Sequence, residues 1–153
     1  MTDSPQEYRR GEFTISTDRS RLDLAAIHAF LSTSYWASGI PLPVVRRSID
    51  HSLCFGLYAG PRQVGFARVV TDQATFAYLA DVYVLEEYRG RGLARWLLEC
   101  ILGHRALQGL RRVTLVTRDA HELYRKLGFT DVAEPWTYME IRARDPYRSR
   151  PNP

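Results

Sequence analysis

The chain has 153 residues, of which 45% are hydrophobic and 25% charged, as is ordinary for one folded domain with a real core. The first six residues lack the apolar region of a signal peptide, and no apolar run is long enough to cross a bilayer. We therefore expect a cytoplasmic protein without a membrane partner.

The formal net charge of +4 is concentrated near the C-terminus, where residues 142–153 carry a net +3. A nucleic-acid site would depend on this stretch, and basic termini are more often solvated than binding arms. We expect a single domain over residues 1–145, a flexible Arg- and Pro-rich tail over 146–153, and no nucleic-acid partner.

The two cysteines, Cys54 and Cys100, each lie in an apolar run and have no framework spacing. We expect both in the core, with no disulfide and no metal site.

Apolar periodicity and turn residues divide the first half of the chain into strands and helices. In chain order they predict a strand at 13–17, a helix at about 22–30 entered at Ser20 or Asp23, a helix at about 43–51, and strands at 53–59, 64–70 and 75–84.

The second half begins with a longer helical pattern. It predicts a helix from 92 to about 107 ended by Gly109, a buried strand at 113–117, a helix at 121–127 ended by Gly128, and extended runs at 129–132 and 138–141. Antiparallel strands followed by a strand, helix, strand crossover indicate a mixed α/β fold. Its central sheet is mostly antiparallel, one half is a parallel βαβ unit, and helices cover both faces.

The segment Arg89-Gly90-Arg91-Gly92-Leu93-Ala94 joins a β-prone run to the long helix. Backbone N–H groups at a helix start have no partner, and they favour phosphate together with the positive end of the helix dipole. A dinucleotide fingerprint would require a third glycine where Arg95 stands, and a P-loop would require Gly-Lys-Ser or Gly-Lys-Thr. The sequence therefore predicts an anion-binding turn of another kind.

This turn resembles the signature of the GNAT family of N-acetyltransferases, in which Arg or Gln precedes two spaced small residues. A second block, Ala120 to Phe129, also resembles the family, because a tyrosine stands shortly before Gly128-Phe129. The resemblance implies an acetyl-CoA-dependent N-acetyltransferase with a GNAT-like fold and no metal. It implies that the turn residues bind the pyrophosphate and that the backbone of Val82, Tyr83 and Val84 binds the pantetheine arm.

The resemblance places Tyr124 where the family has its general acid, which protonates the departing thiolate; the alternative is a tyrosine that packs on one helix face. A strand N–H, of Val82 or Tyr83, would stabilise the oxyanion. Asp81 is the best candidate for a base, and its alternative is a buried aspartate paired with an arginine such as Arg68.

Tyr35 and Trp36 stand in the connection between the first two helices, where the family builds its acceptor pocket. They are expected to form a wall for the acceptor, with core packing as the alternative for one of them. The expected acceptor is the primary amine of a small molecule or peptide, attacked directly in a ternary complex. The alternative is a catalytically silent acyl-CoA-binding sensor module, and a homodimer is a further expectation.

Overall fold

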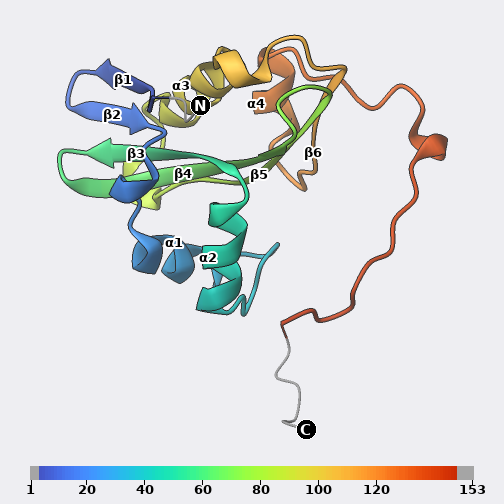
Figure 1. Cartoon of the computed structure of the whole chain (residues 1–153), viewed down its shortest axis with the longest axis horizontal. Helices are drawn as coiled ribbons and strands as arrows, with labels where there is room; N and C mark the ends of the chain where they lie inside the picture. The colour runs from blue at the N-terminus through green and yellow to red at the C-terminus, as the bar shows by residue number, and fades with distance from the viewer. Residues whose placement is uncertain (1–3, 148–153) are drawn as a thin grey trace, which may run out of the picture.

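A computed structural model of the chain describes residues 4–147, which form one six-stranded sheet with helices on both faces. The strands lie in the order β1-β2-β3-β4-β5-β6, and every neighbouring pair is antiparallel except β5 and β6, which are parallel. In Figure 1, α1 and α2 cover one face of the sheet, and α3 and α4 lie on the other. The predicted fold class is confirmed.

The strands are β1 (Glu7–Arg10), β2 (Phe13–Ser16), β3 (Leu53–Ala59), β4 (Arg62–Thr71), β5 (Phe76–Val84) and β6 (Arg112–Leu115). The α-helices are α1 (Leu24–Leu31), α2 (Leu42–Asp50), α3 (Leu93–Leu102) and α4 (His121–Lys126). Short 3-10 turns are η1 (Arg19–Arg21), η2 (Glu86–Tyr88), η3 (Arg105–Leu107) and η4 (Pro135–Thr137).

Both faces of the sheet are packed, which explains why β3 and β4 read as nearly continuous apolar runs. A first cluster lies on the α3 face and includes Phe55, Leu57 and Leu97, all without exposed surface. A second cluster lies on the α1–α2 face and includes Ile27 and Phe66. The sheet is therefore held rigidly from both sides.

Helix α1 begins where a capping carboxylate was predicted. Asp23 Oδ1 accepts a hydrogen bond from the Ala26 N–H at 3.0 Å, which satisfies one of the unpaired donors of the first turn. The second predicted entry residue, Ser20, lies in the preceding turn η1. Of the two predicted starts, Asp23 is confirmed.

Strand β5 contains one extra residue relative to β4. The pairs Phe66↔Tyr83 and Arg68↔Ala80 leave a bulge in β5, and Asp81 lies in it with φ of 55°. An inserted residue reverses which side chains face which side. Accordingly Leu79 packs in the first cluster before the bulge, whereas Tyr83 packs in the second cluster after it.

The long helix after the glycine turn is shorter than predicted. It ends at Leu102 instead of about Leu107, because Gly103 follows and the buried His104 starts a separate turn, η3. His104 Nδ1 accepts from the Ala106 N–H at 3.0 Å, and this bond replaces the next helical one. Gly109, the predicted end, lies in the turn after η3.

The predictions around the last strands were partly wrong. β6 covers Arg112–Leu115 and is only half-buried, because it lies at the edge of the sheet. Residues 129–132 and 138–141 form no strand, and most of their surface is exposed. The sequence analysis also missed β1, which pairs with β2 through a turn at Gly11.

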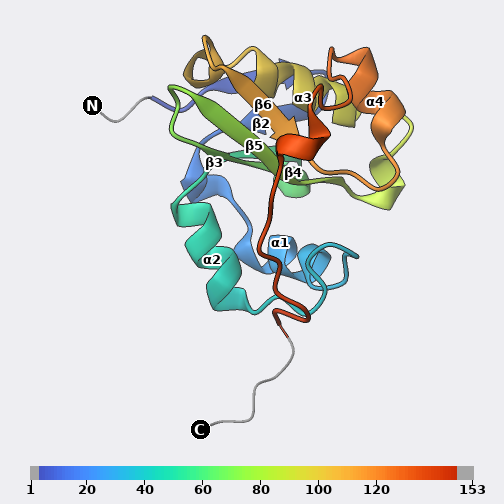
Figure 2. The same cartoon turned by 90° about the vertical axis from the view of Figure 1, so that its right-hand side faces the viewer.

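The chain beyond α4 leaves the sheet in a wide arc towards the α1–α2 face, as the two views in Figures 1 and 2 show. Tyr147 ends this arc and packs against the second cluster beside Gly39. The predicted tail over 146–153 therefore falls mainly outside the described residues. Within residues 4–147, none of the helices is long and apolar enough to span a bilayer.

Strand β4 packs so closely against its neighbours at Gly65 that an alanine there is expected to destabilise the fold. An added Cβ would lie 2.9 Å from both the Tyr83 carbonyl oxygen and Leu57 Cδ2, so backbone or core has to move. We expect Gly65→Ala to lower the free energy of unfolding by about 1–3 kcal/mol, measured by urea denaturation. Gly103→Ala is the control, since its φ is −85° and its nearest atom is 3.3 Å away. An equal midpoint for both variants would contradict the tight packing of β4.

Candidate active site

Strands β5 and β6, the last two strands of the sheet, separate partway along β5. Their pairing runs from Phe76↔Arg112 to Leu79↔Leu115 and stops there, whereas β5 continues to Val84. The half of β5 after the bulge thus has no strand partner on the β6 side within the described chain. This gap exposes a row of backbone donors and acceptors.

The orientation of that backbone follows from strand alternation. The Leu85 N–H donates to the Val64 carbonyl at 2.8 Å, so Leu85 points its backbone groups towards β4. One residue earlier, Val84 points the other way, and its carbonyl accepts from Arg89 Nε at 3.0 Å. By the same alternation Val82 also faces the gap, and Tyr83 faces β4.

The Tyr83 side chain lies on the opposite face from the valines. Its ring stacks on Phe30, with ring centroids 3.8 Å apart, and burial raises the pKa of its hydroxyl. The ring fixes the strand after the bulge against α1. Among the three predicted strand residues, Val82 and Val84 are therefore the ones whose backbone lines the gap.

The predicted anion-binding turn leads directly from this gap into α3. Gly90 and Gly92 have φ of 79° and 74°, values at which residues with a Cβ are strained. No side chain caps α3 at Gly92, and the first helical bond is from the Trp96 N–H to the Gly92 carbonyl. The N–H groups of Leu93 and Ala94 accordingly have no partner within the helix.

The turn also has the space and charge that an anion requires. A Cβ placed on Gly90 or Gly92 would meet no atom within 4 Å, so the backbone is open on that side. The Arg91 guanidinium is exposed, 3.9 Å from Glu12 and 5.4 Å from the centre of the Tyr88 ring. These weak exposed contacts leave Arg91 able to turn towards a ligand.

Tyr124 lies on α4 and reaches the hollow beside β6. The ring of Tyr124 packs edge-on against the ring of Phe129, with the ring centroids 5.6 Å apart. The alternative to the acid role, a tyrosine that packs on one helix face, predicts a contact of this kind. Burial raises the pKa of its hydroxyl to about 12, with smaller contributions from Tyr35 and Asp119. The hydroxyl therefore keeps its proton at neutral pH.

Asp81 is held on both carboxylate oxygens. Oδ2 accepts from Arg68 Nε and Oδ1 accepts from Trp36 Nε1, each at 2.8 Å. Only 9% of the Asp81 side chain is exposed, and Arg68 also donates to Ser52 at 3.1 Å. The arginine pairing named as the alternative to a base is thus present, together with a tryptophan contact that was not predicted.

The loop between α1 and α2 brings its two aromatic residues to the bulge and to the end of β6. Trp36 reaches Asp81, and the Tyr35 hydroxyl accepts from the Arg118 N–H at 3.4 Å. The Arg118 guanidinium lies 3.8 Å from the centre of the Tyr35 ring. The sequence analysis did not single out Arg118. Its position just after the predicted strand 113–117 is the feature that could have indicated it.

Two hollows lie along β6, and neither is at the glycine turn. One, of about 300 Å³, is shared by Tyr124 and residues 113–117, and the other, of about 360 Å³, lies further along the strand. Among the described residues no group of three or more acidic, His or Cys side chains is placed to hold a metal ion. Cys54 is buried and Cys100 is half-buried, both as free thiols.

The chain is similar in sequence and in structure to known acetyltransferases. Residues 50–131, more than half of the chain, match the family model described as "Acetyltransferase (GNAT) domain". A protein of Gibberella zeae named an acetyltransferase is 40% identical over 154 residues, which cover 85% of this chain and 86% of that protein.

Solved structures are similar over most of their length. A GNAT-family protein of Xanthomonas campestris is 51% identical with a TM-score of 0.87, covering 90% of this chain and 97% of that one. The ribosomal-protein-S18-alanine N-acetyltransferase of Escherichia coli is 25% identical with a TM-score of 0.65, covering 78% and 79%. The chain belongs to the GNAT family of acetyltransferases.

Proposed function

We propose that the protein transfers the acetyl group of acetyl-CoA to a primary amine of a small molecule or peptide, by direct attack in a ternary complex. One observation carries the proposal: the edge of β5 at Val82 and Val84, which has no strand partner on the β6 side, leads into the uncapped glycine turn at α3. An extended arm ending in a pyrophosphate fits this sequence of donors, and acetyl-CoA supplies the acetyl thioester when bound.

The open space at Gly90 and Gly92 supports the pyrophosphate end of this assignment, because the donors there are not covered by protein atoms. Leu93 and Ala94 contribute N–H groups, while Arg89 and Arg91 contribute charge. Arg89 already donates to the Val84 carbonyl, so it also joins the turn to the strand.

In this proposal the acetyl thioester of the donor lies at the bulge in β5. The Val82 N–H, which alternation directs into the gap, is the donor that we assign to the developing oxyanion. Tyr124 is the assigned acid for the departing thiolate, because it stands where the family has its general acid and lines the hollow beside β6, and its hydroxyl carries a proton at neutral pH. Tyr35 and Trp36 form the wall on the acceptor side.

We assign Asp81 a positioning role in preference to that of a base. Each of its oxygens already accepts from a protein donor, and those donors come from β4 and from the acceptor loop. The carboxylate thus holds Trp36 against the bulge. A peptide acceptor is included because the Escherichia coli relative is named an N-acetyltransferase for an alanine of a ribosomal protein.

Binding of the donor is tested by a thermal shift with acetyl-CoA. We expect the wild type to gain stability with ligand concentration, and Gly92→Val to lose this gain because a branched side chain fills the space above the donors. Gly109→Val is the matched control, since Gly109 has the same φ of 74°, an equally open Cβ position and no place in the turn. Equal acetyl-CoA shifts in the two variants would refute the site.

The role of Tyr124 is tested by Tyr124→Phe. We expect kcat to fall by about 100-fold or more, with acetyl-CoA binding unchanged. Because the pKa is raised to about 12, the protonated form persists upward to that pH, and the wild-type profile should show no loss from Tyr124 between about pH 7 and 10. Tyr8→Phe on the far edge strand β1 is the control.

The silent-module alternative gives a different result in the same assay. It predicts tight acetyl-CoA binding with no acetylation across an amine library, in the wild type as well as in Tyr124→Phe. Turnover by the wild type rules it out.

The two roles of Asp81 separate in steady-state kinetics. If Asp81 positions Trp36, Asp81→Asn and Trp36→Phe should raise the KM for the amine by similar factors and leave the shape of the kcat against pH profile unchanged. If Asp81 is the base, only Asp81→Asn removes the acidic limb of that profile. The second pattern would overturn the positioning role.

A further inference from the structure

Arg118 lies at the end of the proposed acceptor wall, where Tyr35 holds it in two ways. The Arg118 N–H donates to the Tyr35 hydroxyl at 3.4 Å, and the guanidinium carbon lies 3.8 Å from the centre of the Tyr35 ring. Arg118 follows β6, whereas Tyr35 belongs to the loop between α1 and α2. The two contacts therefore fix the guanidinium relative to the loop that supplies the wall.

The N–H groups of the Arg118 side chain have no acceptor among residues 4–147. The side chain is exposed, and its contact within this part of the chain is the one with the Tyr35 ring. That ring covers one face of the planar guanidinium, while the five N–H donors lie in its plane. A planar anion can take two of these donors in parallel hydrogen bonds.

The carboxylates of this part of the site do not balance the charge of Arg118. Asp81 forms its ion pair with Arg68, at 2.8 Å. Asp119, the next residue in the chain, forms no ion pair with Arg118 in the described structure, and its charge contributes to the raised pKa of Tyr124. The acceptor wall therefore ends in a positive charge that an anionic ligand can match.

An aromatic surface connects Arg118 with the bulge in β5. The rings of Tyr35 and Trp36 meet edge to face with their centroids 5.1 Å apart, and Trp36 Nε1 donates to Asp81 in the bulge at 2.8 Å. Both rings are partly open to solvent, with exposed fractions of 49% for Tyr35 and 41% for Trp36. A ligand that lies along these rings has one end at Arg118 and the other at the bulge.

We propose that the acceptor is an amine that also carries a carboxylate, and that the Arg118 guanidinium binds this carboxylate while the amine lies at the bulge. This inference rests on the proposed acetyl transfer and names its substrate class. The amine nitrogen bonds to the acetyl carbon, the carbon–sulfur bond breaks, and the proton lost by the amine replaces the one that Tyr124 gives to the sulfur. The carboxylate is unchanged by the reaction, so its role is to position the amine.

The charge and shape of one guanidinium favour a carboxylate over other second groups on the acceptor. A carboxylate is planar and carries one negative charge, which Arg118 matches in a bidentate pair. A phosphate ester carries about −1.5 to −2 charges at neutral pH, more than this side chain balances. A second ammonium group would be repelled, so diamines are expected to be poor acceptors.

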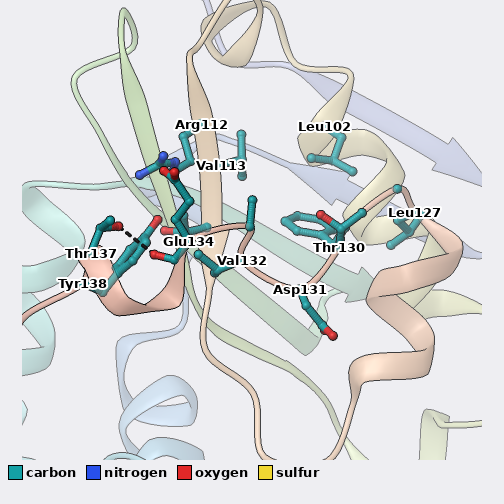
Figure 3. Close-up of a pocket in the computed structure, with 14 residues that line it drawn as sticks. Leu102, Arg112, Val113, Leu127, Thr130, Asp131, Val132, Glu134, Thr137 and Tyr138 are labelled. Atoms are coloured by element: carbon teal, nitrogen blue, oxygen red, sulfur yellow. Dashed lines mark hydrogen bonds between the residues drawn. The ribbon is translucent and has the colours of Figure 1, made fainter.

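Arg112 offers a matched control at the opposite end of β6. It is also an exposed arginine over a tyrosine, with its guanidinium carbon 5.5 Å from the centre of the Tyr138 ring. Figure 3 shows Arg112 and Tyr138 beside the hollow of about 360 Å³, which neither Tyr35 nor Trp36 lines. Arg112→Ala therefore removes the same charge from the same strand, away from the acceptor wall.

Steady-state kinetics with paired acceptors test the assignment. Each pair is an amino acid and its carboxamide, which keeps the amine and lacks the negative charge, and any difference in amine basicity is the same for every variant. We expect the wild type to prefer the carboxylate, and Arg118→Ala to reduce this preference by about 10-fold or more through a higher KM for the amino acid. Arg112→Ala should keep the wild-type preference. No preference in the wild type, or equal effects of the two substitutions, overturns the proposal.

The same kinetics separate the acceptor from other anions. The KM for acetyl-CoA should be the same in Arg118→Ala as in the wild type. A rise in that KM without a rise in the KM for the amino acid would assign Arg118 to the phosphates of the donor and contradict the proposal. A higher kcat/KM for an aminoalkyl phosphate than for the amino acid of equal length would contradict the choice of a carboxylate.

A binding measurement distinguishes failure of this inference from failure of the proposed function. Calorimetric titration with the N-acetylated amino acids, in the presence of free coenzyme A, requires no turnover. We expect Arg118→Ala to weaken this binding by about 10-fold and Arg112→Ala to leave it unchanged. Binding through Arg118 without acetylation of any amine would refute the acetyl transfer and keep the carboxylate site. Acetylation of amines without binding through Arg118 would refute the carboxylate site, and absence of both would refute the two together.

Discussion

The extra residue in β5 is the constraint on which the site depends. Asp81 adopts φ of 55° and shifts the strand by one position against β4. The shift turns the backbone of Val82 and Val84 towards β6 at the point where the β5–β6 pairing ends. A regular strand would pair further along β6 and present no open edge before the glycine turn. A left-handed non-glycine residue is costly, and the bonds from Arg68 and Trp36 offset that cost.

The hydrogen bonds from Arg68 and Trp36 also make the position of the loop between α1 and α2 depend on Asp81. Trp36 belongs to the loop between α1 and α2, and Arg68 belongs to β4, so Asp81 ties the loop to the sheet. Tyr35, next along the loop, reaches the start of the α4 connection through Arg118. The wall that we propose for the acceptor is thus assembled from three distant parts of the chain, and Asp81 in the bulge holds Trp36 in place.

Local sequence signals predicted most of the fold and the position of the turn. The Asp23 cap, the apolar runs of β3 and β4, and Gly90 and Gly92 before α3 each act through neighbouring residues, so the pattern alone is informative. The bulge could not be predicted in this way, because it depends on register with β4. The end of α3 was placed too late because the helix stops at Gly103 and the side chain of His104 starts a separate turn, and the sequence pattern gave more weight to Gly109. The segments 129–132 and 138–141 have residues that suit strands, but neither pairs with the outer edge of β6 in this structure, and residue preference alone does not determine pairing.

Strands β5 and β6 each have an edge without a strand partner among residues 4–147, and the two edges differ in their surroundings. The inner edge, at Val82 and Val84, continues into an electropositive helix start, so it suits an extended anionic ligand. The outer edge of β6 has no such helix and is lined by a mixture of apolar and polar side chains, with Arg112 beside them. Tyr124 lines the hollow beside β6, and its burial raises the pKa of the hydroxyl to about 12, so the buried position favours the protonated form.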